Sequence, residues 1–479
     1  MDPVDPYIQD HLRAVLADFQ ELIAIPSIST DPAYAASVRE AALWVHGRMA
    51  RAGLSAETHE TGGHPIVVGR HLAGPDAPTL LVYAHYDVQP ADPLEAWRSP
   101  PFELTREGGN LVARGAADDK AQVVVQIAAA ETALRTVGVP VNLILLFEGE
   151  EEVGSTHLTP FVAEHRTSLA ADHAIIADSM MFSPDRPSLI FGMRGMAYVE
   201  IEVVSSGHDL HSGQYGGAVP NPVHVLAELV ASFHDPRGRV AVEGFYDDVR
   251  DVPEEMREAW ASMGYDEEAF QRSAGGAALV GEPGYSTPER IWIRPCLDVN
   301  GIVGGYTGPG KKTVLPGRAS AKVSCRLVPD QDPQRILELL RRHIHHHVPA
   351  GVGVRVEAYQ ANPPFRSDPD GRLFEAAGRA LARVYGVEPV RVAHGGTLPI
   401  ARDLSELITP SVAVMGLALP GANMHAPNEW IPARQVERGI RSMVHLYHEL
   451  ASGSDDHPGR LPGSPPSRPD PGSRPGQRS

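Results

Sequence analysis

The chain contains few cysteines and no long apolar run. Cys296 and Cys325 are the only cysteines among its 479 residues, too few for a disulfide framework, so we expect a reducing, cytoplasmic environment. No run of about 18 apolar residues occurs, and we therefore predict no transmembrane helix. Residues 1–10 carry acids at positions where a secretory signal would carry basic and then apolar residues.

Basic residues are also scarce relative to acidic ones. Lysine and arginine number 42 against 60 aspartates and glutamates, which gives a formal net charge of −18. A phosphate backbone or an anionic membrane surface would repel such a protein, so we expect neither nucleic acid nor membrane as a partner. Hydrophobic residues at 42% and charged residues at 21% are typical of a folded globular chain. Its length suggests two domains.

Two different patterns along the chain predict two kinds of sheet. From 66 to 178, apolar strand-like runs alternate with helical segments, which predicts an α/β fold with a doubly wound, mostly parallel sheet. Over 199–203 and 319–327, apolar and polar residues alternate, as in strands with one solvated face. These strands predict an inserted α+β domain. We expect a discontinuous first domain of residues 1–191 and 391–452, an insert of 192–390 and a disordered tail of 453–479.

Apolar residues at helical spacing predict helices, and alternating residues predict a further strand of the insert. The stretch 235–317 is harder to assign and is interpreted as loops, strands of the insert and a short helix over 253–263. Predicted helices cover 5–23, 37–52, 119–134, 223–233, 333–347, 373–384 and 432–450, and predicted strands cover 352–358 and 411–417.

Imidazole and carboxylate side chains follow several of the apolar runs that read as buried strands. The runs 79–83, 141–147 and 174–177 each lead directly toward such residues. Ligand sites in open α/β sheets gather outside the carboxyl ends of the strands. Imidazoles and carboxylates are ligands of divalent cations, and several acids together suggest more than one ion. The residues concerned are His85, Asp87, Asp118, Asp119, Glu151, Glu152, Asp178 and His425.

Each of these patterns also has a plainer interpretation. His85 and Asp87 lie two apart on extended backbone and face the same side, so Asp87 can orient a ligating His85, yet His85 could equally be an ordinary strand-end histidine. Asp118 and Asp119 could cap the following helix, or a carboxylate there could bridge two ions. Most acidic runs such as 148–152 are solvated faces, although here one acid could ligate a cation while its neighbour takes a proton.

Taken together, the motifs resemble those of the co-catalytic dinuclear zinc peptidases. That family includes cytosolic non-specific dipeptidase, carnosine dipeptidase, carboxypeptidase G, acetylornithine deacetylase and succinyl-diaminopimelate desuccinylase. The resemblance runs from about Asp5 to Ser452, and the dipeptidase branch fits best. The motifs that carry it are His-Tyr-Asp-Val-Gln-Pro at 85–90, Trp97 with 100–102, Gly115 with 118–120, Glu-Glu-x-Gly-Ser at 151–155, Asp178, Leu-His-Ser-Gly at 210–213, Thr-Val-Leu-Pro at 313–316, Arg-Leu-Val-Pro at 326–329 and Met-His-Ala-Pro-Asn-Glu at 424–429.

The resemblance implies a pair of divalent cations in the first domain. Asp118 would bridge the two ions, with His85 and Asp178 completing one site and Glu152 and His425 the other. Zn²⁺ is the expected metal, and Mn²⁺ or Co²⁺ would suit the same ligands. The peptide bond between Asp118 and Asp119 is expected to be cis. The first domain would then be the metal-binding catalytic domain, and the insert a lid and dimerisation domain.

The resemblance also implies catalytic and substrate-binding roles. Glu151 would be the general base on a water that bridges the ions, and Asp87 would orient His85. His211 in the insert would reach the active site of the partner subunit of a homodimer. The expected substrate contacts are His211, Thr313, Arg326 and Thr397.

Three functional hypotheses follow. The first is a metal-dependent hydrolase that cleaves the amide bond of dipeptides or small peptides. The second is a deacylase of N-acylated amino acids, of the acetylornithine or succinyl-diaminopimelate type, which would use the same metal centre with a different pocket. The third is a non-catalytic metal-binding scaffold, which the complete set of ligands and base disfavours. The histidine-rich run 343–347 is interpreted as a solvated helix terminus, because the negative end of a helix dipole favours imidazolium.

Overall fold

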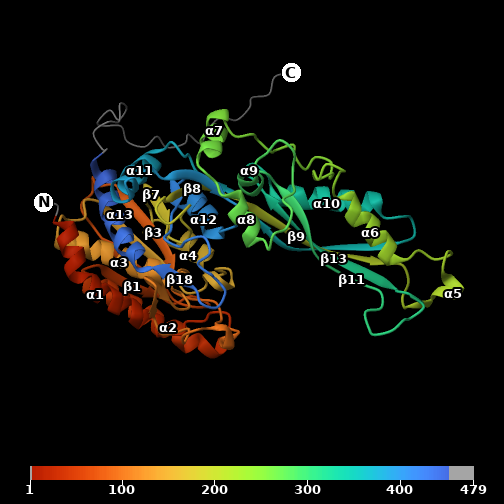
Figure 1. Ribbon diagram of the computed structural model, residues 1–479, viewed down its shortest axis with the longest axis horizontal. Helices are drawn as coiled ribbons and strands as arrows, with labels where there is room; N and C mark the ends of the chain where they lie inside the picture. Colours follow the sequence, from red (N-terminus) through yellow and green to blue (C-terminus); the bar gives the residue numbers. More distant parts are fainter. Residues whose placement is uncertain (1–2, 453–479) are drawn as a thin grey trace, which may run out of the picture.

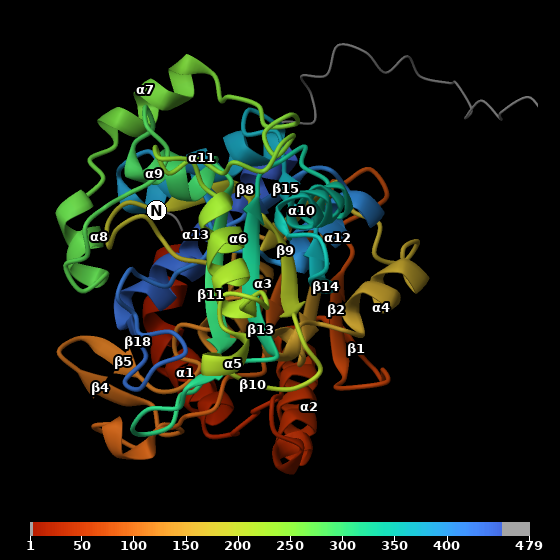
Figure 2. The ribbon, with the colours of Figure 1, turned by 90° about the vertical axis from the view of Figure 1, so that its right-hand side faces the viewer.

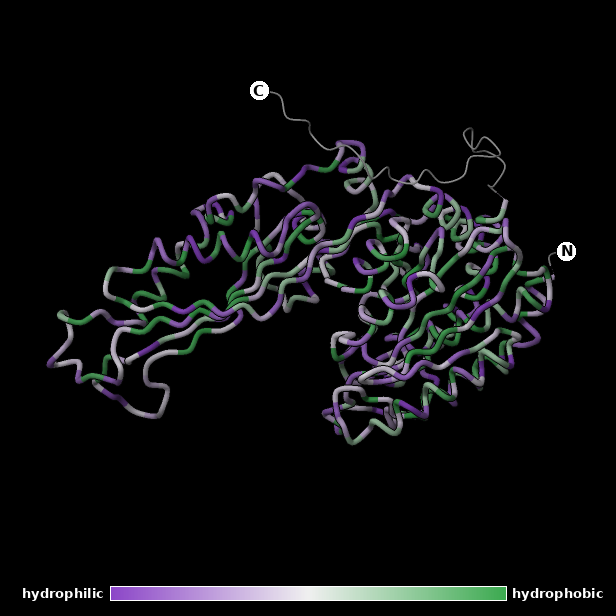
Figure 3. The backbone as a smooth tube through the Cα atoms, turned by 180° about the vertical axis from the view of Figure 1, so that it is seen from behind, coloured by the Kyte–Doolittle hydropathy of each residue, from purple (hydrophilic) through white to green (hydrophobic). Residues whose placement is uncertain are grey.

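The computed structural model describes residues 3–452 and shows an α/β body from which an elongated arm projects (Figure 1). Hydrophobic stretches run through the strands of the body and also along the arm (Figure 3). Within the described residues, no helix combines the length and apolarity that crossing a membrane requires. The tail expected to be disordered, 453–479, lies outside the described residues.

A nine-stranded sheet forms the centre of the body. The strand order is β1-β2-β6-β3-β7-β17-β8-β15, and β16 also pairs with β8. The pairs β3–β6, β3–β7, β7–β17 and β8–β16 are parallel, so the expected α/β fold with a mostly parallel sheet is confirmed. The strands are β1 (Ser55–His59), β2 (Ile66–His71), β3 (Thr79–His85), β6 (Asn142–Glu148), β7 (His173–Ile176), β8 (Ser188–Met193), β15 (Phe365–Arg366), β16 (Val390–His394) and β17 (Val412–Val414).

Helices cover both faces of this sheet, as a doubly wound fold requires. One layer comprises α1 (Val4–Ile23), α2 (Ala35–Ala52), α3 (Lys120–Arg135), α11 (Arg372–Tyr385) and α13 (Ala433–Ser452), which contact one another. Helix α3 is buried on nearly all sides because it lies between the sheet and these neighbours. The short helices α4 (Leu158–Glu164) and α12 (Pro399–Leu407) contact each other in a second layer.

A small three-stranded sheet joins two distant parts of the chain. It contains β4 (Thr105–Glu107), β5 (Asn110–Val112) and β18 (Trp430–Pro432). Because β18 pairs with β5, the loop before α3 lies beside the loop that precedes Trp430. Three 3₁₀ turns, Pro32–Tyr34, Leu94–Ala96 and Glu151–Val153, complete the connections of this region.

A four-stranded antiparallel sheet forms the arm. Its strands lie side by side in the order β11-β13-β9-β14 (Figure 2). Apolar residues of β9 and β13 alternate into a second hydrophobic core beneath the arm helices, which confirms the expected strands with one solvated face. The elements are β9 (Gly195–Val204), β11 (Cys296–Gly304), β13 (Arg318–Leu327), β14 (Gly353–Asn362), α6 (Pro222–Ser232) and α10 (Pro333–His347), with β10 (Leu210–His211), α5 (Ser212–Tyr215) and β12 (Val314–Leu315) at the tip.

Two short connections link the arm to the body. Arg194 separates β8 from β9, and Pro363–Pro364 separate β14 from β15. Helix α11 and the aromatic residues Trp260 and Trp292 belong to the core of the body. Trp260 lies in α7 (Glu254–Ser262) and Trp292 is the last residue of α9 (Thr287–Trp292), with α8 (Glu267–Ser273) between them in sequence. The domain limits 192–390 stay a prediction. We propose 195–362 as the bounds of the arm. The segment around α7–α9 lies within these bounds in sequence but packs on the body.

The helix predictions agree with the structure to within a few residues, and the prediction of 333–347 matches α10 at both ends. The strand expected over 411–417 is shorter, because β17 covers only Val412–Val414. A side chain at Gly416 would lie 1.9 Å from the carbonyl oxygen of Ser179. At that point the chain passes against the backbone at Ser179, where only a glycine fits.

Candidate metal centre

The expected ligands gather at the carboxyl ends of the central strands of the body. His85 is the last residue of β3, and Asp178 follows β7. Glu152 lies in the turn after β6, and Asp118 lies two residues before the start of α3. The loop between β17 and β18 brings His425 to the same place, although it is more than 240 residues distant from each of the other four.

Asp118 lies between two imidazoles and presents one carboxylate oxygen to each. Its Oδ1 is 3.0 Å from His85 Nε2, and its Oδ2 is 3.0 Å from His425 Nε2. Asp178 Oδ2 is 4.0 Å from His85 Nε2, while Glu152 Oε2 is 3.3 Å from His425 Nε2. Two triads that share Asp118 therefore have ligand atoms close enough to hold one cation each.

The donor set fits divalent cations. Four acids crowd together here, and burial together with neighbouring carboxylates raises the pKa of Glu151 to about 9 and that of Asp178 to about 7. Within residues 3–452, Glu152 Oε1 is buried without a hydrogen-bond partner. Cations would neutralise the charge and use such an oxygen, and imidazole with carboxylate suits Zn²⁺, Mn²⁺ and Co²⁺.

The imidazoles already respond to the surrounding acids. Burial opposes the charged form of His85, yet its hydrogen bonds to Asp118 and Asp87 raise its pKa well above the ordinary value. Hydrogen bonds with Asp118 and Glu152 raise the pKa of His425 to about 10. His425 is half exposed, whereas His85 is fully buried, so the site opens to solvent on the His425 side.

Asp87 orients more than the histidine. Its Oδ1 lies 3.3 Å from His85 Nδ1, as expected. The same carboxylate accepts hydrogen bonds from Glu151 N at 3.3 Å, Glu152 N at 3.1 Å and Ser29 Oγ at 2.6 Å. It therefore fixes the turn that carries the proposed base as well as the His85 ring, a link that the sequence pattern did not indicate.

The segment before α3 has the expected cis peptide between Asp118 and Asp119. Asp119 occupies the N-cap position of α3 but makes no side-chain hydrogen bond to the first turn. Its Oδ2 instead accepts a hydrogen bond from His85 N at 3.2 Å. The plainer interpretation of these acids as a helix cap is therefore not supported.

Two of the expected substrate contacts meet where the arm joins the body. Arg326 Nη1 donates to Thr397 Oγ1 at 3.0 Å, and that hydroxyl donates to Arg194 O at 2.6 Å. Among residues 3–452, no carboxylate lies within ion-pair distance of the guanidinium of Arg326 or Arg194. No carboxylate therefore neutralises the charge of Arg326, whereas the Arg194 guanidinium donates to Gly395 O and Arg294 O.

The other two expected contacts lie elsewhere in the chain. His211 is exposed and pairs with Val314 across β10 and β12, next to Thr313. These strands adjoin α5 at the end of the arm, well separated from the sheet of the body (Figure 1). The fold of one chain does not bring His211 or Thr313 to the metal ligands.

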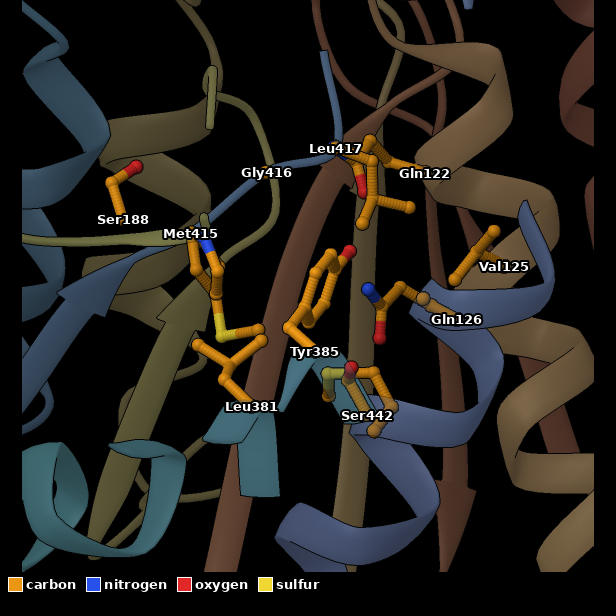
Figure 4. A pocket seen from close by; sticks show the side chains of 13 residues that line it. Gln122, Val125, Gln126, Ser188, Leu381, Tyr385, Met415, Gly416, Leu417 and Ser442 are labelled. Carbon is orange, nitrogen blue, oxygen red and sulfur yellow. The ribbon is translucent and has the colours of Figure 1, made fainter. Parts of the chain in front are cut away.

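A small, mostly apolar cavity with a few polar side chains lies beside α3 (Figure 4). Within the described residues, Gln122 Nε2, Gln126 Oε1 and Ser442 Oγ are buried there without hydrogen-bond partners. The cavity measures about 10 Å³, which is enough for one water molecule and too little for a peptide substrate.

Sequence reasoning missed residues that support the ligands from a second layer. Gln89 Nε2 donates to Glu152 Oε2 at 2.8 Å. Lys120 is buried and donates to Leu22 O and Ile25 O at 2.9 and 2.5 Å, which ties the end of α1 to the start of α3. Glu429 accepts hydrogen bonds from the Asp118 segment. Gln89, Lys120 and Glu429 fall within the motifs that carry the family resemblance, but the sequence pattern indicates no role for any of them.

Comparison with known proteins shows the family to which this chain belongs. Residues 81–449 match the family described as Peptidase family M20/M25/M40. The Cys-Gly metallodipeptidase dug1 of Schizosaccharomyces pombe is 30% identical, with 90% of this chain and 94% of that protein covered. The Beta-Ala-His dipeptidase of Rattus norvegicus is 31% identical, with 81% of this chain and 80% of that protein covered.

Solved structures give the same result. The M20 family metallo-carboxypeptidase Sso-CP2 from Sulfolobus solfataricus superposes with a TM-score of 0.80 at 32% identity, covering 91% of this chain and 99% of that chain. Human carnosine dipeptidase 1 superposes with a TM-score of 0.77 at 28% identity, covering 94% and 98%. The chain therefore belongs to the peptidase family M20/M25/M40 and is a metallopeptidase.

Proposed function

We propose that this chain hydrolyses the amide bond of dipeptides with the help of two divalent cations, with Zn²⁺ as the first candidate and Mn²⁺ or Co²⁺ as alternatives. The observation that carries the proposal is the position of Asp118 between His85 and His425, each of which has a further carboxylate nearby. His85, Asp118 and Asp178 would hold one ion, and Asp118, Glu152 and His425 the other. The dipeptidase names of the relatives support a dipeptide as substrate.

Glu151 is the proposed general base. When bound, the cations supply Lewis-acid chemistry that lowers the pKa of water and polarises the amide carbonyl. Glu151 takes a proton from the attacking water as its oxygen bonds to the carbonyl carbon, and returns that proton to the amine nitrogen as the C–N bond breaks. Asp87 holds the Glu151 backbone in place for both transfers.

Arg326 and Thr397 are the proposed binding site for the carboxylate at the end of the substrate. A guanidinium can grip a carboxylate through two parallel hydrogen bonds. Thr397 already holds Arg326 in position, and Arg326 has no acidic partner within residues 3–452. This arrangement favours substrates with a free C-terminal carboxylate.

The position of His211 and Thr313 at the tip of the arm supports a homodimer. In such a dimer the arm would carry these residues to the metal centre of the partner subunit, where His211 would donate a hydrogen bond to the developing oxyanion. The arm would then act as both lid and dimerisation domain. The cytoplasm is the proposed compartment because Cys296 and Cys325 are both free. The charge of −18 supports a small-molecule substrate over nucleic acid or a membrane.

Substrate profiling tests the proposal. Protein stripped of metal and reloaded with Zn²⁺, Mn²⁺ or Co²⁺ would be assayed on dipeptides with a free N-terminus and on N-acetyl and N-succinyl amino acids. We expect no activity without metal and turnover of dipeptides after reloading. Turnover of the acylated amino acids alone would identify a deacylase instead.

A further inference from the structure

Glu429 holds the backbone of the Asp118 segment through a fully buried carboxylate. Its Oε1 accepts hydrogen bonds from Ala117 N at 2.7 Å and Asp118 N at 2.9 Å. Its Oε2 accepts from Gly115 N at 3.0 Å and from Arg114 Nη1 at 2.7 Å. The Glu429 side chain is 0% exposed and that of Arg114 is 1% exposed. All four donors therefore depend on this one carboxylate for their partner.

Three segments that carry expected metal ligands meet at this ion pair. Arg114 Nη2 donates to Pro90 O at 3.1 Å, in the segment that follows His85. The carboxylate of Glu429 binds the Asp118 segment, and its carbonyl oxygen accepts from Ala113 N at 3.1 Å. Glu429 itself ends the loop that carries His425. The pair touches the backbone of these segments and none of the ligand atoms.

The His425 loop needs such support because its backbone is strained. Asn423, His425 and Asn428 have φ values of 56°, 60° and 61°, a left-handed conformation that residues other than glycine rarely adopt. Asn428 anchors one side of the loop, since its side chain accepts from Arg98 N at 2.8 Å and donates to Ala96 O at 2.9 Å. Glu429 anchors the other side on the Asp118 segment. The position of the His425 imidazole thus depends on contacts outside the loop.

We propose that the buried Arg114–Glu429 pair is a positioning device for the metal centre, which fixes Asp118 relative to His425 and thereby determines how tightly the cation between Asp118, Glu152 and His425 is retained. The inference rests on the proposed two-cation function. Glu429 acts through the backbone of Asp118 and through its own loop, so it is a positioning residue and has no role in the proton transfers.

The variant Glu429→Gln isolates this role with little change of shape. One carboxylate oxygen becomes an amide NH₂ group, so two of the four buried donors then face another donor. The Asp118 and His425 segments are expected to separate. The matched control is Glu289→Gln, because Glu289 is a buried carboxylate that binds Arg257 and Ser286 in the α9 region and touches none of the metal-bearing segments.

Cation binding is measured on the full chain loaded with Co²⁺, by metal content after dialysis, by titration and by the visible spectrum. The wild type and Glu289→Gln should retain two ions. Glu429→Gln should bind one of the two ions about 10–100-fold more weakly, as is typical when a residue that holds metal ligands in place is replaced. Its visible spectrum should change as well. Its kcat should fall while KM changes little. The melting temperature of the metal-free proteins reports any purely structural loss, which both variants would share.

Retention of both ions at wild-type affinity by folded Glu429→Gln would overturn the inference. Should that variant fail to fold, Arg114→Lys decides, because lysine keeps the charge beside Glu429 but loses the planar fork that also reaches Pro90. Weaker retention of one ion by Arg114→Lys supports the positioning role, and unchanged retention overturns it. A wild type that binds no cation would overturn the proposed function together with this inference.

Discussion

At the scale of single residues, Asp118 and Asp87 have different structural roles in the site. Asp118 faces both imidazoles with its two oxygens, so its side chain can join two ions. Asp87 contacts the Nδ1 side of the His85 ring, opposite the Nε2 that faces Asp118, and binds the backbone of Glu151 and Glu152. One carboxylate thus brings the ligands together, and the other fixes the base relative to them.

Glu151→Gln should abolish proton transfer and leave the cations in place. A general base typically contributes about 10²–10⁴-fold to the rate, so kcat on a dipeptide should fall by a factor in that range. Metal content should stay at the wild-type level, because Glu151 belongs to neither ligand triad. Steady-state kinetics and metal analysis on the same sample check both statements. Full activity of the variant would remove Glu151 from the mechanism.

Arg326→Ala should weaken the binding of substrates that carry a C-terminal carboxylate. A hydrogen bond to a charged group contributes about 1.5–3 kcal/mol, so KM for a dipeptide should rise about 10–100-fold. A dipeptide amide lacks the carboxylate and should be a poor substrate of the wild type, with little further loss in the variant. Equal losses on both substrates would show that Arg326 does not read the carboxylate.

The ligands could be predicted from the sequence because they follow apolar runs and fall in short motifs. Their supports could not, since Ser29, Gln89 and Glu429 make contacts across 58, 63 and 311 or more residues. A lone polar residue in a loop gives no periodic signal. Only the three-dimensional pairing of β5 with β18 places Glu429 beside the Asp118 segment.

At the scale of elements, helix positions follow from apolar spacing and from capping residues. Asp332 accepts a hydrogen bond from Gln334 N, and Pro333 begins the helix, so the start of α10 is marked in the sequence. In the stretch 235–317 only the short helix over 253–263 is predicted with bounds, and α7 (Glu254–Ser262) lies there. Its apolar residues are divided between the two cores, because Trp260 and Trp292 pack on the body whereas Phe245 and Leu297 pack in the arm.

The histidine run of α10 should make the arm sensitive to acid through His343. Burial, together with the neighbouring His347 and His346, lowers the pKa of His343 to about 4, from about 6.5 in an unfolded chain. Between these values the unfolded chain binds more protons, so the stabilisation is present above pH 6.5 and is lost as pH falls toward 4.

His343→Gln should therefore reduce the loss of arm stability between pH 7 and pH 5. Because the ring is partly exposed, we expect a difference of about 1 kcal/mol. Denaturant unfolding followed by hydrogen exchange in the arm provides the measurement, with the exposed His345→Gln as control. An unchanged pH dependence in His343→Gln would contradict the assignment, as would an equal effect in His345→Gln.

At the scale of the whole molecule, the body and the arm each have a hydrophobic core, and two short connections link the body to the arm. One core surrounds the nine-stranded sheet, and the other lies between the arm sheet and its helices. This division into an α/β body and an inserted α+β arm followed from the change in alternation pattern. The limits 192–390 stay a prediction, and α11 packs on α13 of the body although it follows the arm in sequence.

Complementation between two inactive variants tests the proposed dimer. His211→Ala lacks a residue at the tip of the arm, and Glu151→Gln lacks the base of the body. If the arm acts in the partner subunit, each mixed dimer has one intact site, so a re-equilibrated equal mixture should recover about a quarter of wild-type activity. An inactive mixture, shown by mass to contain mixed dimers, would contradict action in the partner.

Anomalous diffraction from crystals of the Zn²⁺-loaded protein tests the two-cation centre most directly. Two peaks about 3.5–4 Å apart are expected, with Asp118 between them, His85 and Asp178 at one, and Glu152 and His425 at the other. A single peak, or peaks away from Asp118, would contradict the two-cation centre.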